Sequence, residues 1–164
     1  MIGVIADTAE HDVVREFFEL FKTPWEFFRE DRKYDVLLCA GNHPFSTSAR
    51  LVVVYAGEKI ELDETRHTAI GNQRKAPCVL DYEKKAIPVY GESTSFVGRE
   101  NFLLKNVATD ECVAFFDSSA NQVWARIGFD LFKEIRTLLS AGQPVVNAAS
   151  PTLDLHIVQR EQQQ

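Results

Sequence analysis

The chain has 164 residues, of which 45% are apolar and 26% are charged, and this composition is typical of one soluble globular domain. Its eight glycines and six prolines are too few for a collagen-like or low-complexity chain. Acidic residues outnumber basic ones by 24 to 18, and the net charge of −6 has the wrong sign for binding a phosphate backbone, so we expect no nucleic-acid partner.

The first third of the chain predicts a parallel α/β sheet. Four apolar runs predict strands, at residues 2–6, 25–28, 35–40 and 51–55. Between the first two, apolar residues recur at helical spacing until Pro24 stops the pattern. Strands that are apolar along their whole length are typical of a parallel sheet covered on both faces. We therefore expect an α/β fold with a small parallel sheet flanked by helices.

The middle of the chain predicts two antiparallel hairpins. The runs 77–82 and 86–90 are separated by the polar tripeptide Glu-Lys-Lys, and the runs 112–117 and 123–127 by the polar stretch Ser-Ser-Ala-Asn-Gln. Short polar loops between two apolar runs are the usual signal of such hairpins.

Two helices are predicted toward the carboxyl end. Apolar residues share one face over 129–141, and Gly142 stands where a left-handed helix cap is expected. A second helix is expected to begin at the Ser-Pro pair of residues 150–151. We divide the chain into one α/β domain, 1–149, and a tail, 150–164, that would connect to an absent domain. The apolar side chains of the tail should dock on their own sheet or pair two copies in a weak homodimer.

No targeting or redox motif is found in the sequence. The first apolar run is shorter than the roughly 7–15 residues of a signal-peptide core, and no run approaches the roughly 20 residues of a membrane span. Cys39, Cys78 and Cys112 are odd in number, far apart and without a Cys-x-x-Cys pair. We expect no membrane partner, no disulfide framework and a cytoplasmic location.

Nucleotide and metal motifs are also missing. No two glycines stand two residues apart, so a G-x-G-x-x-G loop cannot be drawn, and the histidines lack a spacing that would bring two imidazoles to one ion. Asp7 and His11 are four residues apart, but Asp7 is better explained as a helix cap. We therefore expect no cofactor and no metal.

A small hydrolase is the alternative from another functional class. Ser93 lies in Gly-Glu-Ser-Thr-Ser, which misses the G-x-S-x-G nucleophile motif at its last position. Cys39 lies in an apolar run and is better explained as a small buried residue. The alternative would use Ser93 or Cys39 as nucleophile and His43 or His11 as base.

Four polar residues are candidates for binding a ligand. In parallel α/β sheets, ligands bind at the carboxyl ends of the strands. Asp7 follows the first predicted strand, Asn42 and His43 follow the third, and Glu58 follows the fourth. If the domain has a binding site, these residues should surround it.

Two segments resemble a known family. Residues 123–144 contain Gly-Phe-Asp-Leu-Phe at a helix start, and 151–157 read Pro-Thr-Leu-Asp-Leu-His-Ile. Both resemble the region before the catalytic domain of bacterial polysaccharide deacetylase-like proteins, and residues 1–57 resemble the flavodoxin and amidotransferase class through Tyr-Asp-Val-Leu-Leu-Cys-Ala-Gly. The resemblance implies a flavodoxin-like N-terminal accessory domain without its enzyme, because the His-x-x-x-His pair of the deacetylase is missing.

The predicted function follows from these observations. We expect a non-catalytic accessory module that binds a catalytic partner domain or a small glycan-derived ligand. No catalytic residue can be assigned to it from the sequence.

Overall fold

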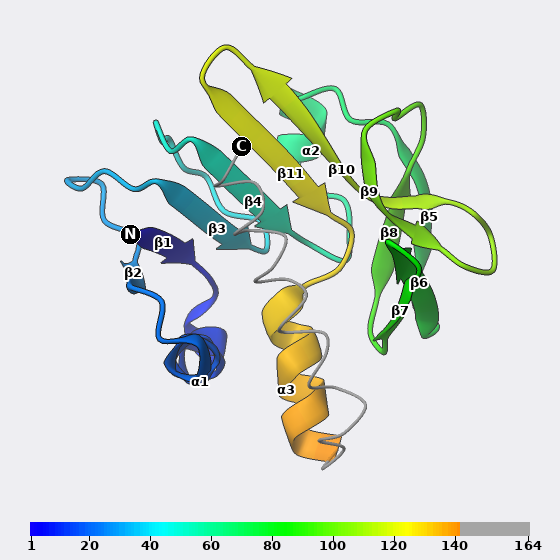
Figure 1. Cartoon of the computed structure of the whole chain (residues 1–164), viewed down its shortest axis with the longest axis horizontal. Helices are drawn as coiled ribbons and strands as arrows, with labels where there is room; N and C mark the ends of the chain where they lie inside the picture. The colour runs from blue at the N-terminus through cyan, green and yellow to red at the C-terminus, as the bar shows by residue number, and fades with distance from the viewer. Residues whose placement is uncertain (142–164) are drawn as a thin grey trace.

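A computed structural model describes residues 1–141, which form one mixed sheet of eleven strands with three α-helices (Figure 1). The strands are β1 (Ile2–Ile5), β2 (Trp25–Phe27), β3 (Val36–Ala40), β4 (Leu51–Tyr55), β5 (Ile70–Arg74), β6 (Cys78–Tyr82), β7 (Lys85–Val89), β8 (Ser93–Phe96), β9 (Phe102–Asn106), β10 (Cys112–Ser119) and β11 (Gln122–Ile127). The helices are α1 (His11–Phe21), α2 (Glu61–Thr65) and α3 (Leu131–Ala141), with a 3₁₀ turn at Thr8–Glu10.

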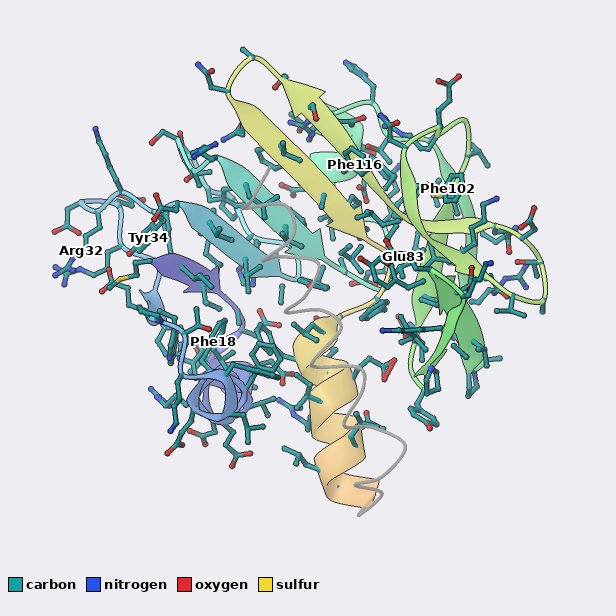
Figure 2. The ribbon with its side chains drawn as sticks, in the orientation of Figure 1. Phe18, Arg32, Tyr34, Glu83, Phe102 and Phe116 are labelled. Carbon is teal, nitrogen blue, oxygen red and sulfur yellow. The ribbon has the colours of Figure 1, made fainter. Side chains whose placement is uncertain are left out.

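One half of the sheet is parallel, in the order β2-β1-β3-β4-β11. All residues of β3 and β4 are buried because both faces of these strands are covered. Leu38 packs into the cluster formed with α1 and α3, whereas its neighbour Leu37 packs into a smaller cluster on the opposite face, beside α2. Figure 2 shows Phe18 between α1 and the first strands, and its ring stacks on that of Trp25 at 5.1 Å.

The other half of the sheet is antiparallel. From β11 the order continues β10-β9-β6-β7, so the path across the sheet begins at β2 and ends at β7, while β8 pairs with β10 and β5. Here burial alternates along a strand: Val79 is exposed and Leu80 is buried. Phe102, labelled in Figure 2 at a distance from α1, belongs to this half.

The expected fold class is wrong. We predicted a small parallel flavodoxin-like sheet with hairpins beside it, but most strand pairs of the single mixed sheet are antiparallel. The apolar runs do form the parallel strands β1, β3 and β4, but the pattern of a hairpin does not show whether its strands join the same sheet. The strand β11 shows this, because it is antiparallel to β10 and parallel to β4.

Several predicted elements are confirmed. The strands expected in the first third and the helices around 13–21 and 129–141 are present. Both hairpins form, and the first turns on Glu83 and Lys84, whose positive φ angles of 48° and 70° fit a two-residue loop. Three strands were not predicted: β5, β8 and β9. The expected tail, 150–164, lies outside the described residues, as do its docking and the homodimer.

Two residues lie in or beside β11, where the halves of the sheet meet. Arg126 of β11 is buried and binds both carboxylate oxygens of Asp63 in α2, through Nε at 2.9 Å and Nη2 at 3.1 Å. The Gly128 carbonyl oxygen accepts a hydrogen bond from the Thr94 N–H, and the Gly128 N–H donates one to the Val113 carbonyl oxygen, both at 2.7 Å. A side chain at residue 128 would overlap the carbonyl oxygen of Thr94, so the close approach of the backbones requires glycine.

Within the described part of the chain, no helix is long and apolar enough to cross a bilayer.

Candidate functional site

A pocket of about 360 Å³ lies where β3 and β4 end, against the first turns of α3. Four segments form its wall: the turn after β3, the loop after β4, the connection from β7 to β8, and the start of α3. The lining residues are Gly41, Asn42, Ala56, Gly57, Glu58, Ile60, Gly91, Glu92, Asp130, Lys133, Glu134 and Thr137. We call this space the carboxyl-end pocket.

Asp130 and Glu134 attach α3 to the pocket wall. Asp130 Oδ1 accepts hydrogen bonds from the backbone N–H groups of Phe132 and Lys133, at 3.1 and 3.2 Å, and so caps the helix. One turn later, the Glu134 carboxylate accepts hydrogen bonds from the N–H groups of Gly91, at 2.9 Å, and Tyr90. Burial raises the pKa of both carboxyl groups, and the backbone hydrogen bonds only partly offset this.

The loop after β4 is held by buried side chains. Arg126 donates to the carbonyl oxygens of Ala56 and Glu58, both at 2.9 Å, and the Thr94 hydroxyl donates to that of Gly57 at 2.7 Å. The carbonyl groups of residues 56–58 are therefore all held by hydrogen bonds from buried side chains, whereas the Glu58 side chain is exposed and lines the pocket.

The four ligand-binding candidates divide into two pairs. Asn42 and Glu58 line the pocket, and the Asn42 Oδ1 atom also accepts a hydrogen bond from the N–H of residue 61. Asp7 and His43 lie beside it: His43 Nε2 is 3.1 Å from Asp7 Oδ1, and both side chains lie next to Gly41. The His43–Asp7 contact has a charge-pair distance without the alignment of a hydrogen bond. That these residues bind a ligand stays a prediction.

Cys39 lies beneath this end of the sheet and is fully buried. Burial, together with the nearby carboxylates of Asp130 and Asp7, raises the pKa of its thiol to about 12. A thiol with that pKa is protonated at neutral pH, and the thiolate is the nucleophilic form of cysteine. Cys39 therefore does not have the properties of a catalytic nucleophile.

The other residues of the hydrolase alternative are separated by their contacts. Ser93 is buried in β8, where its hydroxyl lies 3.7 Å from the Cys78 sulfur, and no histidine within residues 1–141 hydrogen-bonds to it. His11 stacks on the Phe27 ring at 4.0 Å and its Nε2 lies 3.2 Å from a backbone carbonyl oxygen. In the described chain, neither Ser93 nor Cys39 is hydrogen-bonded to a histidine, so the pairs that the hydrolase alternative needs are not formed.

Sequence reasoning missed four charged residues of the pocket: Glu92, Asp130, Lys133 and Glu134. One signal was present. Asp130 and Glu134 are four apart at the start of a strong helical pattern, so their side chains share a face of the first turns. Residues 1–141 bring together no group of three or more side chains that could hold a metal ion.

A larger cavity, of about 980 Å³, lies at the opposite ends of the parallel strands, where β1, β3 and β4 begin. It borders the amino end of the chain, Arg50 and the β10–β11 turn. Its carboxylate, Asp35, already binds the terminal amine at 3.0 Å. We prefer the smaller carboxyl-end pocket, because parallel strands bind ligands at their carboxyl ends and because more charged side chains line it.

No protein-family model matches the chain, and neither does any curated protein. Solved structures do match it. An exo-β-1,4-mannosidase from Opitutaceae bacterium strain TAV5 has a TM-score of 0.68 and 7% identity over 94% of this chain and 35% of its own. A β-galactosidase from Halorubrum lacusprofundi has a TM-score of 0.60 and 6% identity, covering 85% of this chain and 29% of its own.

A third match is the β-galactosidase of the psychrophile Marinomonas ef1, with a TM-score of 0.55 and 10% identity over 91% of this chain and 29% of its own. The chain thus spans about a third of the length of these glycoside hydrolases, and identities this low show a shared fold alone. The expected membership of a deacetylase-like accessory family is wrong, because the structural neighbours are glycoside hydrolases.

Proposed function

We propose that the chain is a non-catalytic module that binds a small glycan-derived ligand in the carboxyl-end pocket. The observation that carries the proposal is the polar lining of this pocket at the ends of β3 and β4, where Asn42, Glu58 and Asp130 meet. Its volume of about 360 Å³ falls in the range of roughly 300–1,000 Å³ that small-molecule sites have.

The chemistry of the lining suits a hydroxyl-rich ligand. A carboxylate accepts hydrogen bonds at both oxygens, an amide both donates and accepts, and an ammonium group donates three hydrogen bonds. Glu58, Asn42 and Lys133 supply these three kinds of group around one space. Sugar hydroxyls donate and accept, so adjacent hydroxyls of one ring could use all of them.

The comparisons support the same ligand class and an accessory role. The structural neighbours are named as a mannosidase and β-galactosidases, enzymes of carbohydrate chemistry. Because the chain spans about a third of their length, a role beside a separate catalytic domain fits its size. The protonated Cys39 thiol and the absence of a histidine at Ser93 in the described chain favour binding over hydrolysis. We also propose that the protein is located in the cytoplasm.

Backbone amide NMR of the ¹⁵N-labelled chain tests the proposal. Glucose, mannose, galactose and their β-1,4-linked disaccharides are titrated in turn. We expect shifts confined to the segments around Asn42, Gly57 and Gly91 for at least one sugar. Shifts confined to the larger cavity at the other ends of the strands, or no shifts with any of these sugars, would overturn the proposal.

A pair of matched variants localises the binding. Glu58→Gln removes the charge of a pocket residue, and Glu16→Gln removes the charge of an exposed residue on α1. We expect Glu58→Gln to weaken binding about tenfold, the usual effect of losing a charged hydrogen bond, and Glu16→Gln to leave it unchanged. Equal affinity of the two variants would place the ligand elsewhere.

A further inference from the structure

The carboxyl-end pocket has an excess of negative charge. Glu58, Glu92, Asp130 and Glu134 line it, and Lys133 is its one cationic side chain among the described residues. None of these five forms an ion pair within residues 1–141, although eleven ion pairs form elsewhere. The negative charges of the pocket are therefore not balanced by the protein around it.

Asp130 is the most informative of these residues. It is only 9% exposed, and its exposed part lines the pocket. Its Oδ1 atom caps α3, whereas Oδ2 accepts no hydrogen bond from any described residue. Burial raises the pKa of the Asp130 carboxyl group, because desolvation outweighs the hydrogen bonds from the backbone N–H groups and the charge of Lys133. One oxygen is thus left for a ligand to satisfy.

We infer that the ligand of the carboxyl-end pocket carries a protonated amine beside its hydroxyl groups, as an amino sugar does, and that Asp130 Oδ2 accepts a hydrogen bond from this ammonium group. The inference rests on the function proposed above. An ammonium group has three donors and one positive charge, so it can satisfy Oδ2 and also interact with Glu58 or Glu92. A neutral sugar could donate a hydroxyl to Oδ2 but would leave the excess charge unbalanced.

A divalent metal ion fits the pocket less well. Such an ion needs several oxygen ligands within about 2.6 Å of one point. No three carboxylate, histidine or cysteine side chains of the described chain meet at one point. Asp130 Oδ1 and both Glu134 oxygens already accept backbone hydrogen bonds. A single ammonium donor needs only the free oxygen and room for the attached ring.

Three matched ligands test the inference by calorimetry: glucosamine, glucose and N-acetylglucosamine, at a slightly acidic pH that keeps the amine protonated. Glucosamine should bind about tenfold or more tightly than glucose, because hydrogen bonds between charged groups are the strong ones. N-acetylglucosamine retains the nitrogen without its charge and should lose this advantage. Added salt should weaken glucosamine binding more than glucose binding.

Asp130→Asn separates the two roles of the residue. Asparagine is as good a helix cap as aspartate, so Oδ1 of the amide keeps its backbone hydrogen bonds while the charge is lost. We expect glucosamine affinity to fall about tenfold and glucose affinity to fall by a smaller factor, because a neutral hydroxyl loses no attraction between charges. The control is Asp81→Asn, an exposed carboxylate on β6 that should change neither affinity. Glu58→Gln provides a second pocket variant if Asp130→Asn lowers the melting temperature.

The outcomes distinguish this inference from the proposed function. Glucose and glucosamine binding equally well in the carboxyl-end pocket would overturn the amine inference and leave glycan binding intact. A glucosamine preference that both pocket variants retain would overturn the role of the pocket carboxylates. No binding of any sugar would overturn the proposed function itself.

Discussion

The two halves of the sheet differ in how their strands are buried. In the parallel half, β3 and β4 are covered on both faces and every residue is apolar or nearly so. In the antiparallel half, β6 buries Leu80 and Tyr82 but exposes Val79 and Asp81. The difference teaches that the burial pattern of these strands records the number of covered faces: every residue is buried in β3 and β4, and alternate residues are buried in most of β6. The candidate pocket is built mainly on the fully covered half and takes one wall from the connection β7–β8.

The largest effect is expected where the halves meet. Arg126→Met would leave the buried Asp63 carboxylate without its partner and free the carbonyl groups of the loop after β4. Breaking a buried ion pair from one side costs about 3–5 kcal/mol of unfolding free energy. Urea unfolding measures the loss. The control is Arg29→Met, whose exposed pair with Asp31 should cost less than about 1 kcal/mol. Similar losses in both variants would show that the buried Arg126–Asp63 pair stabilises the fold no more than an exposed ion pair does.

The second largest effect on the unfolding free energy is expected from Glu111, in the antiparallel half, and it depends on pH. Burial tends to raise the pKa of Glu111, but hydrogen bonds from Asn72, Arg74, Thr109 and Ser95 outweigh it and lower the pKa from 4.5 to about 2. A lowered pKa stabilises the fold above the ordinary value, and that stability is lost as the pH falls from about 4.5 toward 2. The loss should be about 3 kcal/mol.

The measurement is the unfolding free energy as a function of pH. Glu111→Gln should flatten the acid limb of the curve and lower stability near neutral pH. The control is Glu100→Gln, which changes an exposed carboxylate before β9 and should keep the shape of the wild-type curve. An unchanged acid limb in Glu111→Gln would refute the assignment.

The same substitution in each half gives a direct comparison. Val53 in β4 is fully buried, and Val79 in β6 is 43% exposed. Val53→Ala should cost about 2 kcal/mol, from lost apolar burial and the cavity left behind. Val79→Ala should cost less than about 0.5 kcal/mol, as surface substitutions do. Thermal unfolding monitored by circular dichroism gives both values, and equal costs would contradict the difference in burial.

The smallest expected effect concerns labelling and leaves stability untouched. Cys39 is buried in the parallel half, whereas Cys78 and Cys112 are only partly buried in the antiparallel half. Because burial raises the pKa of the Cys39 thiol to about 12, Cys39 should react with a thiol reagent more slowly than the other two in the native state. All three should react at similar rates in urea. Rapid native labelling of Cys39 would reopen its role as a nucleophile.

Much of the parallel half could be predicted from the sequence, because β1, β3 and β4 are continuous apolar runs. The strand β8 could not, since it reads Ser-Thr-Ser-Phe yet is buried throughout. Thr94 donates its hydroxyl hydrogen bond to a carbonyl oxygen, and Ser95 donates to the Glu111 carboxylate at 2.9 Å. Buried hydroxyl groups with such partners are tolerated in a core, and the partners lie far away in the sequence.

The candidate site was half predictable. The rule that ligands bind at strand carboxyl ends led to Asn42 and Glu58, but no local pattern shows that Asp130 folds back to the same place. The family resemblance failed for a physical reason. In Gly-Phe-Asp-Leu-Phe, the glycine permits a close backbone contact, the aspartate caps α3 and the apolar residues pack on the sheet. Helix starts of this kind meet general needs of folding, so unrelated proteins can share the motif.

The edge strands of the sheet determine whether the sheets of two molecules can pair. An exposed edge strand offers unpaired N–H and C=O groups to another molecule. At one end β2 has only three residues, and at the other β7 contains Pro88, which has no N–H to donate. Neither end presents a long, regular row of backbone groups. At β2 and β7, another molecule therefore has little backbone on which to continue the sheet, and the remaining edge is β5, which pairs with β8 alone among the described strands.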